Sequence, residues 1–369
     1  MNPNEYVPII LDIGDRAIRA GIAGEHRPSV QIAANLVASS STKSLFPSFL
    51  ETEDHSLTDI QREELHKTLE KSAHYTQLSQ IYGHDQRQWL NCNDDVKLNL
   101  LLFEVFTQMA IPTRNCKVVV IDRKFSNLWK LKILNVLLTR LRIKSVIFYD
   151  EPILSVVGAN VRNGLVVNFD WSCVTTNVVV DLRIINTYEF STECSGAGLH
   201  YLTVLKLIQM ESPVVKHKDL FHIVEKFLND VLYDSHGVNE ESEGMSGIPR
   251  ELYGFMTEEI TVKFSNLVEE IVSIVALQTL DNRAQLLDNV IVTGSVASIP
   301  RFKTKFLNQL NEKLNSKGIF TLGSWSGGSM FVSTKLINQD DQWRKHQYTR
   351  ERLNSLVDNN GYKLAAVQD

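Results

Sequence analysis

Residues 7–23 read VPIILDIGDRAIRAGIA. An apolar, β-branched run ends in the polar group Asp12-Ile13-Gly14-Asp15, and a second β-forming run begins at Ala17. This order is typical of a strand, a polar turn and a return strand. We therefore expect a β-hairpin with a carboxylate at the end of its first strand.

The same features return about half a chain later. Residues 164–167 form a short apolar run, the polar group Asn168-Phe169-Asp170-Trp171-Ser172 follows, and residues 174–180 are again rich in β-branched side chains. Two hairpins of one design predict a duplicated α/β domain. We expect the two turns to face each other across a cleft.

Strands and helices alternate after each hairpin. We expect, in chain order, a strand over 117–122, a helix over 128–141, a strand over 145–148, helices over 199–210, 220–233 and 260–280, a strand over 289–295, and a helix over 300–314. Such alternation is typical of mainly parallel sheets that helices cover on both faces.

Composition and charge exclude several classes of protein. The 369 residues suggest two or three domains. The formal net charge of −5, without a dense basic cluster, argues against binding to nucleic acid or to anionic lipid. No run of 18 apolar residues occurs, and the four cysteines are widely spaced. We expect a soluble intracellular protein whose cysteines are buried thiols, without a zinc site or a disulfide framework.

Two polar stretches interrupt the periodic pattern. Residues 39–44 and the acidic residues 51–54 are predicted to form one surface insertion. Residues 235–247 are rich in Ser, Gly and Glu and have almost no apolar side chains. This composition predicts a disordered loop.

The two hairpin turns have the chemistry of a phosphate clamp. Consecutive backbone NH groups in such turns can cradle phosphate oxygens. The Asp12 carboxylate and the Asn168 amide would hold waters on Mg²⁺, Arg19 would neutralise phosphate, and the Gly294-Ser295 turn would approach from the nucleoside side. Each feature taken singly also fits an ordinary turn, so only their order carries weight.

A series of motifs resembles the actin superfamily. They are, in order, Leu11-Asp12-Ile13-Gly14 with Arg19-Ala20-Gly21-Ile22-Ala23-Gly24, then Phe46-Pro47-Ser48, Ile153-Leu154-Ser155, Gly164-Leu165-Val166-Val167-Asn168, Asn289-Val290-Ile291-Val292-Thr293-Gly294 and Trp325-Ser326-Gly327-Gly328-Ser329. The resemblance covers nearly the whole chain. It implies an actin-like, duplicated ribonuclease H-like α/β fold with two lobes, four subdomains and ATP or ADP with Mg²⁺ in a central cleft. Trp325 and Met330 are expected to pack beside a Gly-Gly turn.

The resemblance also divides the chain. It implies a first lobe over 1–158, with a reduced subdomain 2 at 34–77. The second lobe would span 159–333, with a reduced subdomain 4 at 196–276, and residues 334–369 would pack back on the first lobe.

By the same resemblance, the nucleotide would contact Asp12, Gly14, Asp15, Arg16, Arg19, Glu151, Asn168, Asp170, Trp171, Gly294 and Ser295. Several of these residues depart from the family's pattern. The family has small residues where this chain has Asp15 and Arg16, a Gln that orients the attacking water where it has Glu151, and a second Gly where it has Ser295.

The departures weaken the expected site. A carboxylate about 5 Å from a phosphate costs about 3 kcal/mol at an effective dielectric of about 20, and Asp15 and Asp170 both carry that charge. Asn168 can reach Mg²⁺ through a water, as Asp12 can, but it lacks the charge that attracts the metal. We assign no catalytic residue and expect no efficient hydrolysis. Two outcomes stay open: Asp15 points to solvent or pairs with Arg16 and the nucleotide is retained, or nucleotide binding is lost.

Compared with actin, which the chain resembles, the segments 47–82 and 210–250 are reduced. The resemblance therefore implies a subunit that docks by one end and presents a poor surface for further addition. Residues 281–290 and 166–172 are similar to the divergent actin-related proteins at the pointed end of the dynactin filament. That resemblance implies a non-catalytic structural subunit in the cytoplasm, on the cytoskeleton. Its partners would be other actin-related proteins or actin in a short filament, and dynactin pointed-end adaptor subunits. Neither nucleic acid nor direct membrane binding is expected.

Two alternatives remain. A nuclear actin-related subunit of a chromatin-remodelling complex would share the fold, although its usual long insertions and basic signals are missing here. An active actin-like ATPase or sugar kinase would need intact Gly-rich turns and a catalytic carboxylate. Asp15, Trp171 and Ser295 argue against that reading.

Overall fold

The computed structural model describes residues 6–14, 17–33, 95–171, 173–190, 194–216, 220–233, 248–249, 251–298, 300–336 and 340–357. The expected surface insertions at 39–44, 51–54 and 235–247, the reduced subdomain 2 at 34–77, and Asp15 and Arg16 lie outside the described residues.

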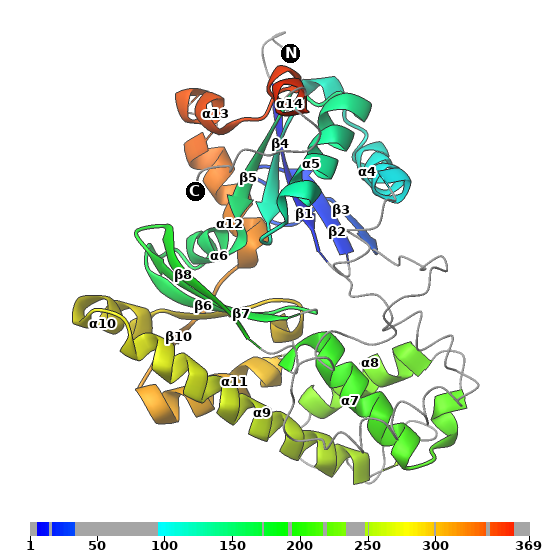
Figure 1. Ribbon diagram of the computed structural model, residues 1–369, viewed down its shortest axis with the longest axis vertical. Coiled ribbons are helices and arrows are strands. Elements are labelled where there is room, and N and C mark those ends of the chain that lie inside the picture. Colours follow the sequence, from blue (N-terminus) through cyan, green and yellow to red (C-terminus); the bar gives the residue numbers. More distant parts are fainter. Residues whose placement is uncertain are drawn as a thin grey trace.

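The described part of the chain is an α/β structure with two five-stranded sheets (Figure 1). The first sheet has the order β3-β2-β1-β4-β5, from β1 (Val7–Ile13), β2 (Ala17–Ile22), β3 (Val30–Ala33), β4 (Cys116–Asp122) and β5 (Ser145–Asp150). The second has the order β10-β9-β6-β7-β8, from β6 (Gly164–Phe169), β7 (Val174–Val180), β8 (Arg183–Phe190), β9 (Val290–Thr293) and β10 (Gly318–Ile319).

The two sheets share one topology. In each, three consecutive strands pair antiparallel, and two later strands add parallel to the open side of the first. Both expected hairpins are therefore confirmed. The expectation of mainly parallel sheets is wrong, because both sheets are mixed. A short turn such as the one after Ile13 can join only antiparallel neighbours, whereas a helical crossover joins parallel ones.

Helices occupy most of the segments between these strands. They are α4 (Asp95–Met109), α5 (Asn127–Leu134) with the π-helical segment Asn135–Arg140, α6 (Glu151–Gly158), α7 (Gly196–Gln209), α8 (Leu220–Tyr233), α9 (Glu251–Ala276), α10 (Leu280–Asp288), α11 (Pro300–Leu314), α12 (Gly323–Phe331), α13 (Asp340–His346) and α14 (Arg350–Val357). None of these helices in the described chain is both long and apolar enough to cross a bilayer.

The expected helices over 128–141, 199–210, 220–233 and 300–314 are confirmed to within a few residues. The helix expected over 260–280 begins earlier, at Glu251, because Leu252 and Met256 continue the buried stripe of Ile260 at i, i+4 spacing. It ends at Ala276, shortly before Thr279 starts the next helix as its N-cap residue.

The first sheet is covered on both faces, as the sequence predicts. One face packs against α4 and α5, with Leu11 in a core that also contains Phe106. The opposite face carries Ile10, which packs with Leu154 of α6, Trp325 of α12 and Trp343 of α13. Ile10 and Leu11 are adjacent in β1 and point to opposite faces, as the alternation of a strand requires.

The second sheet has a larger core on one face, formed with α7, α8, α9 and α11 and containing Phe169 of β6. Its other face packs Val166 and Ile291 against Val156 of α6. Helix α6 therefore contributes Val156 to the second sheet and Leu154 to the first, and so connects the two halves (Figure 1).

The Trp325-Ser326-Gly327-Gly328-Ser329 block is helical, so the expected Gly-Gly turn is wrong. Trp325 is buried as expected, but Met330 is 37% exposed. Glycine in a helix interior is unfavourable unless a close approach requires it. A Cβ at Gly327 would lie 1.9 Å from the Leu154 carbonyl oxygen, so glycine is required where α12 crosses α6.

The burial expected for the cysteines is confirmed for the three that the structure describes. Cys116, Cys173 and Cys194 are buried, and Cys92 lies outside the described residues. Burial raises the pKa of the Cys116 thiol to about 11.

Candidate functional site

The carboxyl ends of the two central strands carry the first two site residues. Asp12 lies near the end of β1 and is 1% exposed, and Asn168 lies near the end of β6 and is 6% exposed. Carboxyl ends of strands in such sheets are the usual location of ligand sites. The sequence predicted this placement for both residues, and a third residue connects Asp12 to the two carboxylates that Asn168 contacts.

That residue is Arg123, which directly follows β4. Its Nε lies 3.0 Å from Asp12 Oδ1 and its Nη2 lies 3.3 Å from Asp12 Oδ2, so the guanidinium binds this carboxylate with two nitrogens. Nη2 also lies 3.3 Å from Glu151 Oε1, and Nη1 lies 2.5 Å from Asp170 Oδ2. One cation therefore joins carboxylates from both hairpins and from the start of α6. We call Arg123, Asp12, Glu151, Asp170 and Asn168 the Arg123 cluster.

Asn168 completes this cluster as a hydrogen-bond donor. Its Nδ2 donates to Glu151 Oε2 at 3.0 Å and to Asp170 Oδ2 at 3.3 Å. Since both neighbours accept, the amide nitrogen has to face them. Its Oδ1 is buried and has no hydrogen-bond partner among the described residues. A carboxylate at this position would add a negative charge beside two others, so an uncharged amide suits the cluster.

Two further interactions support the carboxylates. Arg19 lies opposite Asp12 across the first hairpin, with Nη1 3.5 Å from Asp12 Oδ2, and its side chain is 39% exposed. Glu151 is the first residue of α6, where the helix dipole favours negative charge. The Ser324 hydroxyl of α12 lies 3.5 Å from Glu151 Oε1.

The electrostatics of the cluster hold Arg123 in its charged form. Burial lowers the pKa of its guanidinium, but attraction by Asp12, Asp170 and Glu151 outweighs burial. The pKa of Arg123 therefore lies well above its ordinary value. The cluster is a permanently paired group, because three carboxylates share a cation that does not titrate.

Two glycines shape the turns around the cluster. Gly14 closes the first hairpin, where its NH donates to the Ala17 carbonyl at 3.0 Å, and it lies beside the Arg123 guanidinium. Gly294 has φ +107°, and a Cβ there would lie 2.2 Å from the Phe169 carbonyl oxygen and 2.5 Å from Asn168 Oδ1. Ser295 follows as an exposed turn residue.

Trp171 is placed apart from the other predicted site residues. It is buried among His200, whose ring centroid is 5.8 Å away, and Phe221, at 5.6 Å. A Cβ at Gly196, the first residue of α7, would lie 2.7 Å from the indole. The indole therefore packs against helices α7 and α8 of the second half. In this position it is not placed to contact a nucleotide beside the Arg123 cluster.

Sequence reasoning missed Arg123. The signal was present, because Arg123 follows the buried strand β4, which is the parallel neighbour of β1. The rule that located Asp12, a polar residue at the carboxyl end of a central strand, applies to it equally. Asp122, the residue before Arg123, is not part of the cluster. Its carboxylate accepts a hydrogen bond from the Phe125 NH at 2.9 Å and forms an ion pair with Lys130 at 2.5 Å.

The cluster does not fit Mg²⁺·ATP in the arrangement that the actin resemblance implies. Hydrated Mg²⁺ needs carboxylate or amide oxygens that face it. Here the oxygens of Asp12 and Asp170 face a guanidinium that lies between the two hairpins. Within the described ranges, no group of three His, Cys, Asp or Glu side chains is arranged to hold a metal ion.

Comparisons with known proteins give no family. No family model matches the chain, and a search of curated proteins found no significant match. The site must therefore be interpreted from its own geometry.

Proposed function

We propose that the chain is a non-catalytic, actin-related structural subunit that caps the pointed end of the dynactin filament in dynein-based transport. The ordered motifs from Asp12 to the Trp325 block support an actin-like identity. So does the repetition of one strand order in both sheets, with α6 packed against each of them. In this proposal the protein works in the cytoplasm, on the cytoskeleton, and docks to an actin-related neighbour at one end and to adaptor subunits at the other.

The single observation that carries the non-catalytic part is the position of Arg123. Hydrolysis of ATP needs a metal ion beside the phosphates and a side chain that orients the attacking water. In the proposed site Asp12 and Asp170 bind Arg123 instead. Glu151, at the position of the family's water-orienting residue, is occupied by Arg123 and by Asn168. In this arrangement Arg123 engages all three carboxylates of the cluster, so none of them is placed to act on a water molecule.

The capping role can be tested with the tagged full-length chain as bait in a native pull-down. Conventional actin serves as the matched control bait. We expect the chain to recover dynactin subunits from cytosol, which actin does not enrich. Recovery of remodeller subunits from nuclear extract without dynactin would contradict the proposal in favour of the nuclear alternative. Steady ATP turnover that Asp12→Asn abolishes would contradict it in favour of the enzyme.

A further inference from the structure

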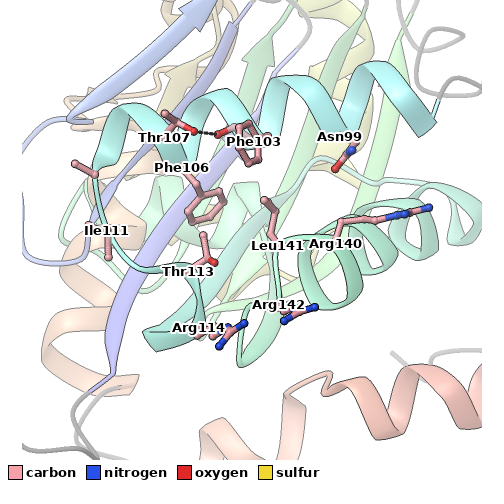
Figure 2. A pocket seen from close by; sticks show the side chains of 11 residues that line it. Asn99, Phe103, Phe106, Thr107, Ile111, Thr113, Arg114, Arg140, Leu141 and Arg142 are labelled. Carbon is pink, nitrogen blue, oxygen red and sulfur yellow. Dashed lines mark hydrogen bonds between the residues drawn. The ribbon is translucent and has the colours of Figure 1, made fainter.

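A pocket of about 640 Å³ opens on the first half of the molecule, at a place that the Arg123 cluster does not use. It lies between α4, the short turn Thr113–Asn115 that precedes β4, and the end of the π-helical segment Asn135–Arg140 (Figure 2). Its volume is within the range of about 300–1,000 Å³ typical of pockets that take a small ligand. The pocket therefore has room for a few side chains of a peptide.

One wall of the pocket is apolar. Phe106 is buried beneath it, and Phe103, one turn earlier on α4, lines it while 60% exposed. Leu100, three residues before Phe103 and so on the same side of the helix, is 61% exposed. Leu100 is not part of the lining, but together with Phe103 it makes an exposed apolar surface on α4, of the kind that a partner covers.

The other wall is basic. Arg114, Arg140 and Arg142 line the pocket and are exposed, and Figure 2 shows the guanidinium groups of Arg114 and Arg142 at one rim. None of the three makes an ion pair with a carboxylate in the described part of the chain, unlike Arg123 or Arg162. This concentration of positive charge contrasts with the formal net charge of −5 of the whole chain.

Glu104, which follows Phe103 on α4, does not neutralise the positive charge of this wall. Glu104 accepts a hydrogen bond from Gln108 at 3.1 Å and is absent from the pocket lining. The pocket thus combines apolar surface with three guanidinium groups that pair with no carboxylate of the described residues. Guanidinium groups bind carboxylates in a planar, two-nitrogen geometry.

We propose that this pocket binds an acidic segment of a partner polypeptide. A large apolar side chain of the segment packs on Phe103 and Phe106, and flanking carboxylates pair with Arg114, Arg140 and Arg142. A simple anion would use the arginines and leave the apolar wall bare, which is why a peptide is the better match. The proposal goes beyond the capping role and involves none of the Arg123 cluster, so either can fail without the other.

Fluorescence anisotropy with a labelled Glu-Asp-Phe-Glu-Asp peptide tests this proposal on the full chain. We expect saturable binding that the double variant Arg114→Glu/Arg140→Glu weakens by about tenfold or more, since each lost ion pair removes a factor of about three. Phe103→Ser is expected to weaken binding by a similar factor. The charge-matched control Arg183→Glu/Lys226→Glu, at exposed positions of the second half, should bind like the wild type.

Several results would overturn the proposal. They are no binding of this peptide to the wild type, equal binding of a Lys-Lys-Phe-Lys-Lys peptide, or unchanged affinity in both pocket variants. Displacement by millimolar inorganic phosphate together with an unchanged Phe103→Ser variant would identify a plain anion site instead. The neutral variant Arg114→Gln/Arg140→Gln keeps the test decisive if charge reversal disturbs folding, which melting curves of each variant report.

Discussion

Replacing Arg123 with alanine is expected to lower the free energy of unfolding by about 3–5 kcal/mol, the usual cost of removing one partner from a buried ion pair. Asp12 is 1% exposed and Glu151 is 5% exposed, so neither carboxylate can recover its solvation by turning to water. Asp170 would lose its guanidinium contact at 2.5 Å as well. Because these carboxylates come from both hairpins and from α6, the loss affects the contact between the two halves of the fold.

Urea unfolding followed by circular dichroism measures this effect. Arg114→Ala is the matched control, because Arg114 is exposed and forms no ion pair in the described chain, and its stability change should stay within about 0.5 kcal/mol. Adding Asp170→Asn to Arg123→Ala should restore part of the loss by removing an uncompensated charge. A loss below about 1 kcal/mol for Arg123→Ala, similar to that of an exposed ion pair, would show that the cluster is not a buried pair.

Gly327→Ala is expected to destabilise the protein by about 3 kcal/mol, at the upper end for overpacking. The added Cβ would lie 1.9 Å from the Leu154 carbonyl oxygen and 2.8 Å from the Gly158 nitrogen. Both are backbone atoms of α6, so no side-chain rotation can relieve the contact. The helices must separate, which also moves Glu151 at the start of α6 away from Arg123.

Two other glycines provide controls for thermal melting. A Cβ at Gly328 would approach the Leu154 Cδ1 at 3.2 Å, a flexible side-chain atom, so Gly328→Ala should cost far less than Gly327→Ala. Nothing lies within 4 Å of a Cβ at Gly254 in α9, so Gly254→Ala should be neutral or stabilise by about 0.5–1 kcal/mol. Equal melting temperatures for the Gly327 and Gly328 variants would refute the close helix crossing.

Local pattern was sufficient to predict much of this fold. The two hairpins and helices α8 and α11 follow from apolar periodicity and turn residues alone. The sequence was misleading at the Trp325 block, where two adjacent glycines resemble a turn but form a helix. What decides their conformation is the backbone of α6, more than 160 residues earlier in the chain, and no local pattern reports such a contact.

The site was predicted only in part, again because contacts between distant residues leave no local pattern in the sequence. Asp12 and Asn168 could be found because each ends a strand within a recognisable hairpin. Arg123 also ends a central strand, but it belongs to no hairpin motif, and its partners Asp12 and Asp170 lie 111 and 47 residues away. The predictions for Asp15 and Arg16 stay predictions, because both lie outside the described residues.

These contacts show how the chain's own side chains join the two hairpins. In the expected nucleotide site Mg²⁺ and its phosphates would join the two hairpins. In this chain a guanidinium of fixed charge joins Asp12 to Asp170, and the uncharged amide of Asn168 donates to Asp170 where a carboxylate would repel it. We therefore infer that Arg123 takes the place that a metal ion would have between the two hairpins.

Thermal melting of the wild-type protein with excess Mg²⁺·ATP, and again after EDTA, tests this claim most directly. A ligand present at a hundredfold excess over its dissociation constant stabilises a folded protein by about 2.7 kcal/mol. If Arg123 fills this place, the melting temperature should differ from that of the protein alone by less than about 1 °C in either condition. A rise of several degrees with Mg²⁺·ATP that EDTA reverses would contradict it.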